Sequence, residues 1–268
     1  MEFTIREAAT LEDALATEEL QIAAWNFSDR EVVPHSSMIV ARHTGGLVAL
    51  AWVGDRPAGF VYGLAACEGD RRWQHSHMLA VHPDFQGTGV APALKWFQRD
   101  WARKRGVGLV TWTFDPLLTK NARLNFGKLG AYADTYYQDF YGVRTGLYAG
   151  LPADRLYVKW ELDHPRVVAR ATGAVPPPPE PEGEPLNVTA GEGPDLRPER
   201  LLEPKAERVY LEVPRDIEAM KRHDLALARA WRLHTREAFK TAFAQGYRAV
   251  ELARRGPRVY YQLEKAPR

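Results

Sequence analysis

Hydrophobic and polar positions follow two different periods along the first 165 residues. Short runs that are apolar or alternate with polar residues predict strands, because successive strand side chains point to opposite faces. Stretches in which apolar residues recur every three to four positions predict helices. The expected strands cover residues 3–7, 47–53, 58–66, 75–81, 108–116, 132–141 and 154–162, and the expected helices cover 11–27, 90–104 and 121–131. Strands and helices that alternate in this way predict an α/β fold.

A proline-rich segment interrupts this pattern. Six of the ten residues from Pro176 to Pro185 are proline, a composition that favours an extended spacer over a helix or an inner strand. We therefore expect a first domain at 1–165, a linker at 166–195 and a small C-terminal α+β unit at 196–268. In that unit the pattern predicts strands at 208–214, 247–252 and 258–263 and helices at 216–223 and 225–244.

The most informative segment is the turn between the strand at 75–81 and the helix after it. Gly87 and Gly89 permit a sharp turn or a close ligand approach, and Pro92 fits only in the first turn of a helix. Apolar residues mark one helix face, and five polar or charged residues, Lys95, Gln98, Arg99, Arg103 and Lys104, are expected on the others. The segment thus predicts free backbone amides and a helix dipole directed at an anion near residues 88–91.

Two phosphate motifs do not match this turn. The dinucleotide fingerprint requires a third glycine where this chain has Pro92, and the nucleotide P-loop requires a Gly-Lys-Ser/Thr sequence that is missing here.

The sequence Gln86-Gly87-Thr88-Gly89-Val90-Ala91 resembles the Gln/Arg-x-x-Gly-x-Gly/Ala signature of the GNAT N-acetyltransferase superfamily, and the order of predicted elements resembles that fold over residues 1–165. The resemblance implies an α/β (α+β) fold with a GNAT-like mixed central sheet flanked by helices, and an acyl-CoA co-substrate, acetyl-CoA or succinyl-CoA. It also implies that the six signature residues bind the pyrophosphate and that backbone amides at Leu79, Ala80 and Val81 meet the thioester. Asn121, directly before Ala122, is the expected asparagine contact to the coenzyme.

The chain departs from the family pattern at the residue that often protonates the leaving thiolate. Phe126 stands in place of that tyrosine and has no proton to donate. Tyr141 is the replacement that we expect, and Asn125 is expected to bind the acceptor or to order water. For the base we expect His77, with His75 as second choice, because a histidine titrates near neutral pH. A period of two places both on one strand face with Leu79 and Val81. Structural roles for these side chains stay open.

Cations at 229, 232, 236 and 240 recur along one face of the C-terminal helix. A solvated surface is one interpretation. The other is a clamp in which Arg232 and Arg236 bind a substrate carboxylate through their guanidinium forks. Asp115, which ends a predicted strand before Pro116, either orients the acceptor amine or caps the next turn. The whole chain is similar to a GNAT group that includes succinyl-CoA:amino-acid N-succinyltransferases.

Composition excludes several classes of function. With 36 basic and 34 acidic residues the net charge is +2, which argues against a nucleic-acid or membrane partner. No long apolar run or cationic leader is present, so we expect a cytoplasmic location. Cys67 is the single cysteine; it excludes an intrachain disulfide, and no metal site is expected. A homodimer is left open.

These features predict an N-acyltransferase that moves an acetyl, succinyl or other acyl group from acyl-CoA to the amine of a small molecule such as an amino acid, by direct attack in a ternary complex. A non-catalytic acyl-CoA sensor or interaction module is the alternative.

Overall fold

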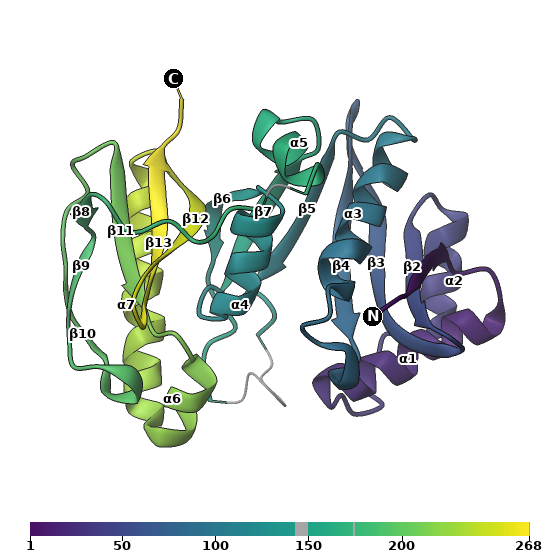
Figure 1. The fold of residues 1–268 in the computed structure, drawn as a ribbon, viewed down its shortest axis with the longest axis horizontal. Coiled ribbons are helices and arrows are strands. Elements are labelled where there is room, and N and C mark those ends of the chain that lie inside the picture. Colours follow the sequence, from purple (N-terminus) through teal and green to yellow (C-terminus); the bar gives the residue numbers. More distant parts are fainter. Residues whose placement is uncertain (143–149, 174, 268) are drawn as a thin grey trace. The chain divides into compact units, whose positions relative to one another are not determined.

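The computed structural model describes residues 1–142, 150–173 and 175–267, which form two units. Unit 1 comprises Met1–Trp112 and Glu161–His164, and unit 2 comprises Thr113–Trp160 and Pro165–Arg268 (Figure 1). The division falls within strand β5 (Leu109–Phe114) and within strand β7 (Arg155–Glu161).

Unit 1 is built on a mostly antiparallel sheet with the strand order β1-β2-β3-β4-β5. The four strands before β5 are β1 (Thr4–Glu7), β2 (Leu47–Val53), β3 (Arg56–Glu68) and β4 (Arg71–Val81). Only the β4–β5 pair is parallel in this unit, and it joins Gln74 to Val110 and His75 to Thr111. Strands predicted from alternation at 3–7, 47–53, 58–66 and 75–81 are confirmed.

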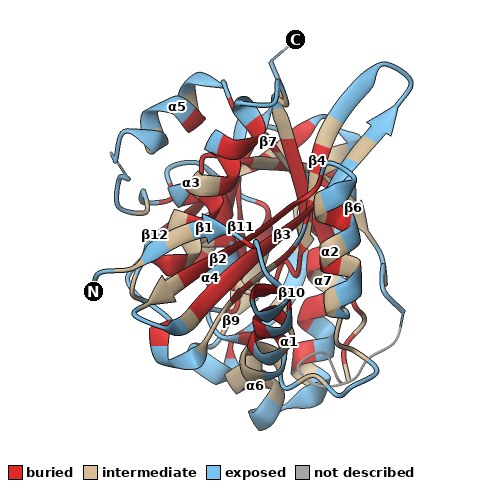
Figure 2. Ribbon diagram, turned by 90° about the vertical axis from the view of Figure 1, so that its right-hand side faces the viewer, coloured by how far each residue is buried: buried red, intermediate tan, exposed pale blue. Residues whose placement is uncertain are grey.

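Helices cover both faces of this sheet. Helices α1 (Leu11–Trp25) and α2 (His35–His43) share a core with β2, β3 and β4 on one face, where buried residues concentrate (Figure 2). Helix α3 (Val90–Arg103) packs against β2, β3 and β4, and the short 3-10 helix η1 (Pro83–Phe85) precedes it. A capping box between Thr10 and Asp13 fixes the start of α1.

A β-bulge in β4 changes which residues share a strand face. Tyr62 of β3 pairs with Met78, but the next residue, Gly63, pairs with Ser76, so His77 is the extra residue. His75 and His77 therefore lie on the α1/α2 face. There the centres of the His77 and Tyr62 rings are 5.7 Å apart. The prediction that they share a face with Leu79 and Val81 is wrong, because one inserted residue inverts the alternation.

Unit 2 contains the mostly antiparallel strands β7-β6-β12-β13-β11-β8, in that order. Besides β7, its strands are β6 (Tyr132–Tyr137), β12 (Tyr247–Arg255), β13 (Arg258–Lys265), β11 (Arg208–Val213) and β8 (Glu184–Pro185). A separate pair contains β9 (Asn187–Ala190) and β10 (Arg197–Leu201). Its helices are α4 (Thr119–Ala122), α5 (Pro165–Ala171), α6 (Ile217–His223) and α7 (Leu225–Ala244), with a 3-10 turn η4 (Gly193–Asp195). The elements predicted after residue 208 are confirmed.

The helix expected at 121–131 is split. After α4 the chain forms a π-helical segment, η2 (Arg123–Lys128), in which the amide of Leu129 bonds to the carbonyl of Leu124 at 3.0 Å. A Cβ on Gly127 would lie 2.0 Å from Nη1 of Arg123, so glycine lets that guanidinium cross the segment toward Glu251. Single π turns occur often at functional sites.

The segment expected to be a spacer at 166–195 contains regular structure. It includes most of α5, the strands β8 and β9 and the turn η4, while the described prolines from Pro176 to Pro179 have no regular structure. The leucine after the prolines, Leu186, is buried, and its amide bonds to Tyr210 of β11. An apolar residue beside an available strand edge explains why part of this segment joins the fold. Within the ranges described, no helix has the length and apolar character needed to cross a bilayer.

Candidate functional site

The turn before α3 has the geometry of an anion cradle. Gly87 and Gly89 have φ angles of +80° and +97°, a region that disfavours residues with a Cβ. Thr88 closes the turn by donating its hydroxyl to the carbonyl of Phe85 at 2.6 Å. A Cβ at either glycine would meet no atom within 4 Å, so the space in front of the turn is open.

Backbone amides converge on this open space. Gly89 caps α3, and the first intrahelical bond runs from the amide of Ala93 to the carbonyl of Gly89. In the part of the chain that the structure describes, the amides of Gly87, Gly89, Val90 and Ala91 donate to no backbone carbonyl. Since these donors lie at the positive end of the helix dipole, residues 86–91 can bind a pyrophosphate.

Strand β4 leads directly into the cradle and has a free edge. After the pairs at Gln74 and His75, the described residues of β4 pair only with β3. Leu79, Ala80 and Val81 thus place backbone groups along this edge, immediately before the cradle. These residues and the signature residues 86–91 all lie in unit 1, so the structure brings the predicted coenzyme-binding residues of this unit together in one strand-turn-helix.

The two histidines of β4 lie side by side with their rings 6.4 Å apart. The side chain of His77 is exposed, yet desolvation by the surrounding residues lowers its pKa from the usual value. Nδ1 of His75 lies 3.1 Å from Oγ1 of Thr111. Burial, together with charge on His77 and on Lys95, lowers the pKa of His75 to about 4. Both imidazoles are neutral at pH 7, as an acceptor of a proton must be.

Helix α3 buries polar side chains that the sequence pattern assigned to other faces. Lys95, Gln98 and Arg99 are buried, so that prediction is wrong. The sheet side of α3 is polar here, because Gln74 and Ser76 of β4 provide hydrogen-bond partners for Gln98 and Lys95. A period of 3.6 residues identifies the helix but does not show that the strand beneath it is polar.

Unit 2 contains the remaining candidates. Asn125 is buried within η2, and no hydrogen bond of its side chain is found among the residues that the structure describes. Phe126 is fully buried against the rings of Phe114 and Tyr261. Asn121 lies exposed on α4.

Tyr141 is the exposed phenol of unit 2 that the sequence singled out. Its hydroxyl lies 3.2 Å from Oγ1 of Thr113. The guanidinium of Arg155 lies 5.2 Å from the centre of its ring, an arrangement that holds the ring in place. Arg155 has no sequence signal, because the periodicity of β7 marks its position only as one on the strand.

Two arginines of α7, Arg232 and Arg236, bind protein carboxylates. Arg232 is 1% exposed and lies 2.5 Å from Asp115. Arg236 makes two bonds of 2.9 Å to Asp154, which also accepts the hydroxyl of Tyr136 at 2.7 Å. Burial acts to lower the pKa of Arg232, but Asp115 raises it above its usual value. Burial acts to raise the pKa of Asp154, but hydrogen bonds from Arg236 and Tyr136 lower it.

The two arginines differ in what they can still bind, although the sequence pattern gives Arg232 and Arg236 the same role. Arg236 donates from both Nε and Nη2 to Asp154. Arg232 keeps two buried nitrogens, Nε and Nη1, without a hydrogen-bond partner in the described ranges. The solvated-surface interpretation applies to the ends of the stripe, Arg229 and Lys240, whose residues are exposed.

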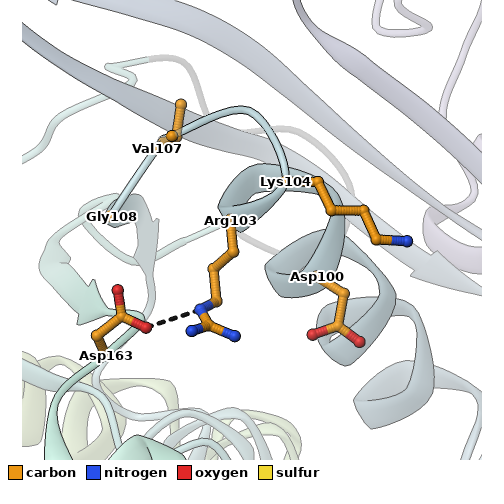
Figure 3. Close-up of a pocket in the computed structure, with 7 residues that line it drawn as sticks. Asp100, Arg103, Lys104, Val107, Gly108 and Asp163 are labelled. Carbon is orange, nitrogen blue, oxygen red and sulfur yellow. Dashed lines mark hydrogen bonds and ion pairs between the residues drawn. The ribbon is translucent and has the colours of Figure 1, made fainter.

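A hollow of about 470 Å³ lies at the other end of α3, away from the cradle (Figure 3). Arg103, which points across it, is paired with Asp163 at 2.7 Å. Gly87 and Gly89 do not line it. Among the described side chains, no group of three or more His, Cys, Asp or Glu residues is arranged to hold a metal ion.

Comparison with solved structures gives similarities of fold. The chain is similar to the ribosomal-protein-S18-alanine N-acetyltransferase of Escherichia coli, with 18% identity and a TM-score of 0.49 over 60% of this chain and 94% of that one. It is similar to a candidate acetyltransferase of Salmonella typhimurium solved with its cofactor acetyl-CoA, with 20% identity and a TM-score of 0.48 over 60% and 95%. It is also similar to the IAA acetyltransferase of Bacillus cereus, with 16% identity and a TM-score of 0.47 over 60% of this chain and 99% of that one.

No curated protein matches the chain. A family model does match, over residues 9–131, and it is the model of the acetyltransferase (GNAT) family. This range contains α1, the strands β2 to β5, the cradle and the segment with Asn125. Residues 9–131 of this chain are therefore similar to the acetyltransferase (GNAT) family.

Proposed function

We propose that the chain transfers an acyl group from acyl-CoA to the amine of a small molecule by direct attack in a ternary complex. The observation that carries this proposal is the set of four free amides at Gly87, Gly89, Val90 and Ala91, at the start of α3. A pyrophosphate held there orients the rest of the coenzyme along the free edge of β4. In this arrangement the thioester carbonyl receives hydrogen bonds from the backbone of Leu79 to Val81.

The base in this proposal is His77. An amine acceptor enters as an ammonium ion and must lose a proton before its nitrogen can attack the thioester carbon. The neutral imidazole of His77 takes that proton, directly or through a water molecule. Attack forms the new C–N bond, and collapse of the tetrahedral intermediate breaks the C–S bond.

The departing thiolate needs a proton, and we assign this role to Tyr141. Its hydroxyl is exposed and oriented by Thr113, whereas Tyr136 is bonded to Asp154 and Tyr261 to the carbonyl of Pro116. Asn125 then binds the acceptor or orders a water molecule, since its buried amide has no other partner among the described residues. Asn121 completes the contacts to the coenzyme.

The acceptor class follows from Arg232. We propose that its two unpartnered nitrogens, Nε and Nη1, hold a carboxylate, either that of an amino-acid acceptor or the distal one of a succinyl group. Asp115 orients the guanidinium and, through it, the substrate. Since Nε and Nη2 of Arg236 are bonded to Asp154, this arginine contributes to the site by holding α7 in place.

The experiment measures thiol release from acetyl-CoA and succinyl-CoA with a panel of amines. The panel contains amino acids of both chiralities, their amides, which lack the carboxylate, and a short peptide with an N-terminal alanine. We expect release that depends on amino acids and is weaker with the amides. Binding of coenzyme A without release by any amine would instead support a sensor, to which Phe126 would be suited.

Replacement of His77 by glutamine is expected to lower kcat/KM by about 10²-fold to 10⁴-fold, the usual contribution of a general base. The coenzyme Kd should not change, because the cradle is intact. His43→Gln, an exposed histidine at the end of α2, is the matched control. Equal activity of the His77 variant and the control would remove His77 from the mechanism.

Loss of the Tyr141 hydroxyl is expected to slow thiolate departure. In Tyr141→Phe we expect kcat to fall by about 10²-fold with little change in KM, because the proton is needed only after binding. Tyr137→Phe removes a neighbouring hydroxyl and should keep the wild-type rate. Steady-state kinetics of both variants test the assignment, which fails if the two rates agree.

A further inference from the structure

The α1/α2 face of the β3–β4 hairpin extends beyond the core that the two helices cover. Within that core, Tyr62 of β3 lies opposite Met78 of β4, and both side chains are buried. Further along β3, Leu64 and Ala66 share this face by alternation, but neither belongs to the core cluster that the described residues form with α1 and α2. The half of the hairpin next to its turn is largely exposed (Figure 2).

Three neighbouring apolar side chains lie on this exposed part. Leu64 pairs with His75 and Ala66 pairs with Trp73, and residues directly opposite each other in an antiparallel pair share a face. Leu64 is 36% exposed, while Ala66 and Trp73 are half-buried. We call Leu64, Ala66 and Trp73 the apolar strip. Single exposed apolar residues are common on protein surfaces, but a contiguous group indicates a surface that meets an apolar ligand or partner.

The apolar strip begins beside His77. The bulge inserts His77 between the residues that pair with Tyr62 and Gly63. The centre of its ring lies 6.4 Å from that of His75, which is the cross-strand partner of Leu64. Diagonal neighbours on adjacent strands are about 7 to 8 Å apart. A substituent on an amine held at His77 can therefore contact Leu64.

The far end of the apolar strip is charged. Trp73 lies four residues before His77, which is about 13 Å at the spacing of a strand. The guanidinium of Arg71 lies 5.6 Å from the centre of the Trp73 ring, and Arg71 pairs with Glu68 across the hairpin. The strip is thus far smaller than the roughly 20 to 30 residues that each side of a specific protein interface contributes. A small ligand, rather than a second copy of the chain, is the occupant that fits it.

We propose that the apolar strip binds the side chain of the acceptor, which makes the acceptor an amine with an aliphatic or aromatic side chain and Leu64 a residue that determines specificity. The identity of this ligand as the acceptor rests on the proposed function, whereas its binding to the strip does not. With the nitrogen at His77, the side chain lies against Leu64 and is removed from water, which favours binding in proportion to the apolar area that is buried. An amine without a side chain, such as glycine, lacks this contribution.

The binding test is an NMR titration of the full chain with phenylalanine and with glycine as probes. The indole N–H signal of Trp73 is assigned by its loss in Trp73→Phe. We expect phenylalanine to shift this signal together with the ring signals of His77, and glycine to leave the Trp73 signal in place. In Leu64→Thr the affinity for phenylalanine should fall about tenfold, the effect of one or two methylene groups in a binding site.

Thiol release measures the same preference during the reaction. In wild type we expect kcat/KM for phenylalanine to exceed that for glycine at least about tenfold. Leu64→Thr, which keeps a residue of high β propensity, should lower this ratio about tenfold. Val40→Thr changes an apolar residue of α2 that is 60% exposed and lies outside the apolar strip. This matched control should keep the wild-type ratio.

The outcomes separate this inference from the proposed function. Thiol release with equal kcat/KM for the two amino acids, or a preference that Leu64→Thr keeps, overturns the role of the apolar strip and leaves the proposed function in place. Absence of thiol release, with a Trp73 signal that phenylalanine shifts in wild type but not in Leu64→Thr, contradicts acyl transfer and supports the strip as a ligand site. A Trp73 signal that phenylalanine does not shift overturns the inference in either case. A lower particle mass for Leu64→Thr in sedimentation would also overturn it, because a second copy would then cover the strip.

Discussion

Replacement of Asp115 by alanine is expected to lower the free energy of unfolding by about 3 to 5 kcal/mol. The reason is the guanidinium of Arg232, which is 1% exposed and would lose its only hydrogen-bonded carboxylate among the described residues. An uncompensated buried charge costs more than the pair contributes. Urea unfolding, followed by a probe in unit 2, measures the loss.

Two comparisons separate this effect from a general sensitivity to loss of charge. Asp84→Ala breaks the pair between Arg56 and Asp84, whose side chains are 63% and 57% exposed, and should cost less than about 1 kcal/mol. The double variant Asp115→Ala with Arg232→Met removes both charges and should recover much of the stability. A cost of less than about 1 kcal/mol for Asp115→Ala would show that Arg232 finds other partners.

Replacement of Gly89 by alanine is expected to weaken coenzyme A binding at least tenfold. A Cβ meets no neighbour here, so the effect comes from the backbone, since φ at +97° disfavours alanine by about 1 to 2 kcal/mol. The turn relaxes by rotating the amides of Gly89 and Val90 away from the pyrophosphate. Calorimetric titration with coenzyme A measures the change without requiring activity.

Gly106→Ala is the matched control for this variant. Gly106 follows the other end of α3, has φ at +72° and also has open space around its Cβ position. Both variants should lose similar stability, but only Gly89→Ala should lose affinity. Equal Kd values for the two variants would mean that the coenzyme binds elsewhere. The proposed function would then be contradicted, because it rests on coenzyme binding at residues 86–91.

The sequence predicts the elements of both units well, because their signals are local. Gly87, Gly89 and Pro92 identify the turn and the first turn of α3 without knowledge of any distant contact. The proline run marks an irregular segment correctly, but not the short strands beside it, since β8 forms only by pairing with β11. Nor does any sequence pattern indicate that the boundary between the two units lies after Trp112.

The predicted site is less complete where geometry depends on partners far apart in the sequence. One extra residue in β4, which no local pattern reveals, inverts the face on which the histidines lie. The burial of Lys95 depends on polar residues of β4 that are about 20 positions earlier in the chain. Likewise, the stripe on α7 predicts a row of cations but not that Asp115 and Asp154 already occupy its two central members.

The boundary between the two units, which falls inside β5, determines how this chain can be truncated. The family match ends at residue 131, within unit 2, and four strands of that unit, β8, β11, β12 and β13, come from the last third of the sequence. A fragment cut after residue 165 would lose the partner of Asp115, the strand beside Ala133 and the ring stacked on Tyr136. The segment that the family model matches therefore depends on packing and ion-pair partners from the C-terminal part of the chain.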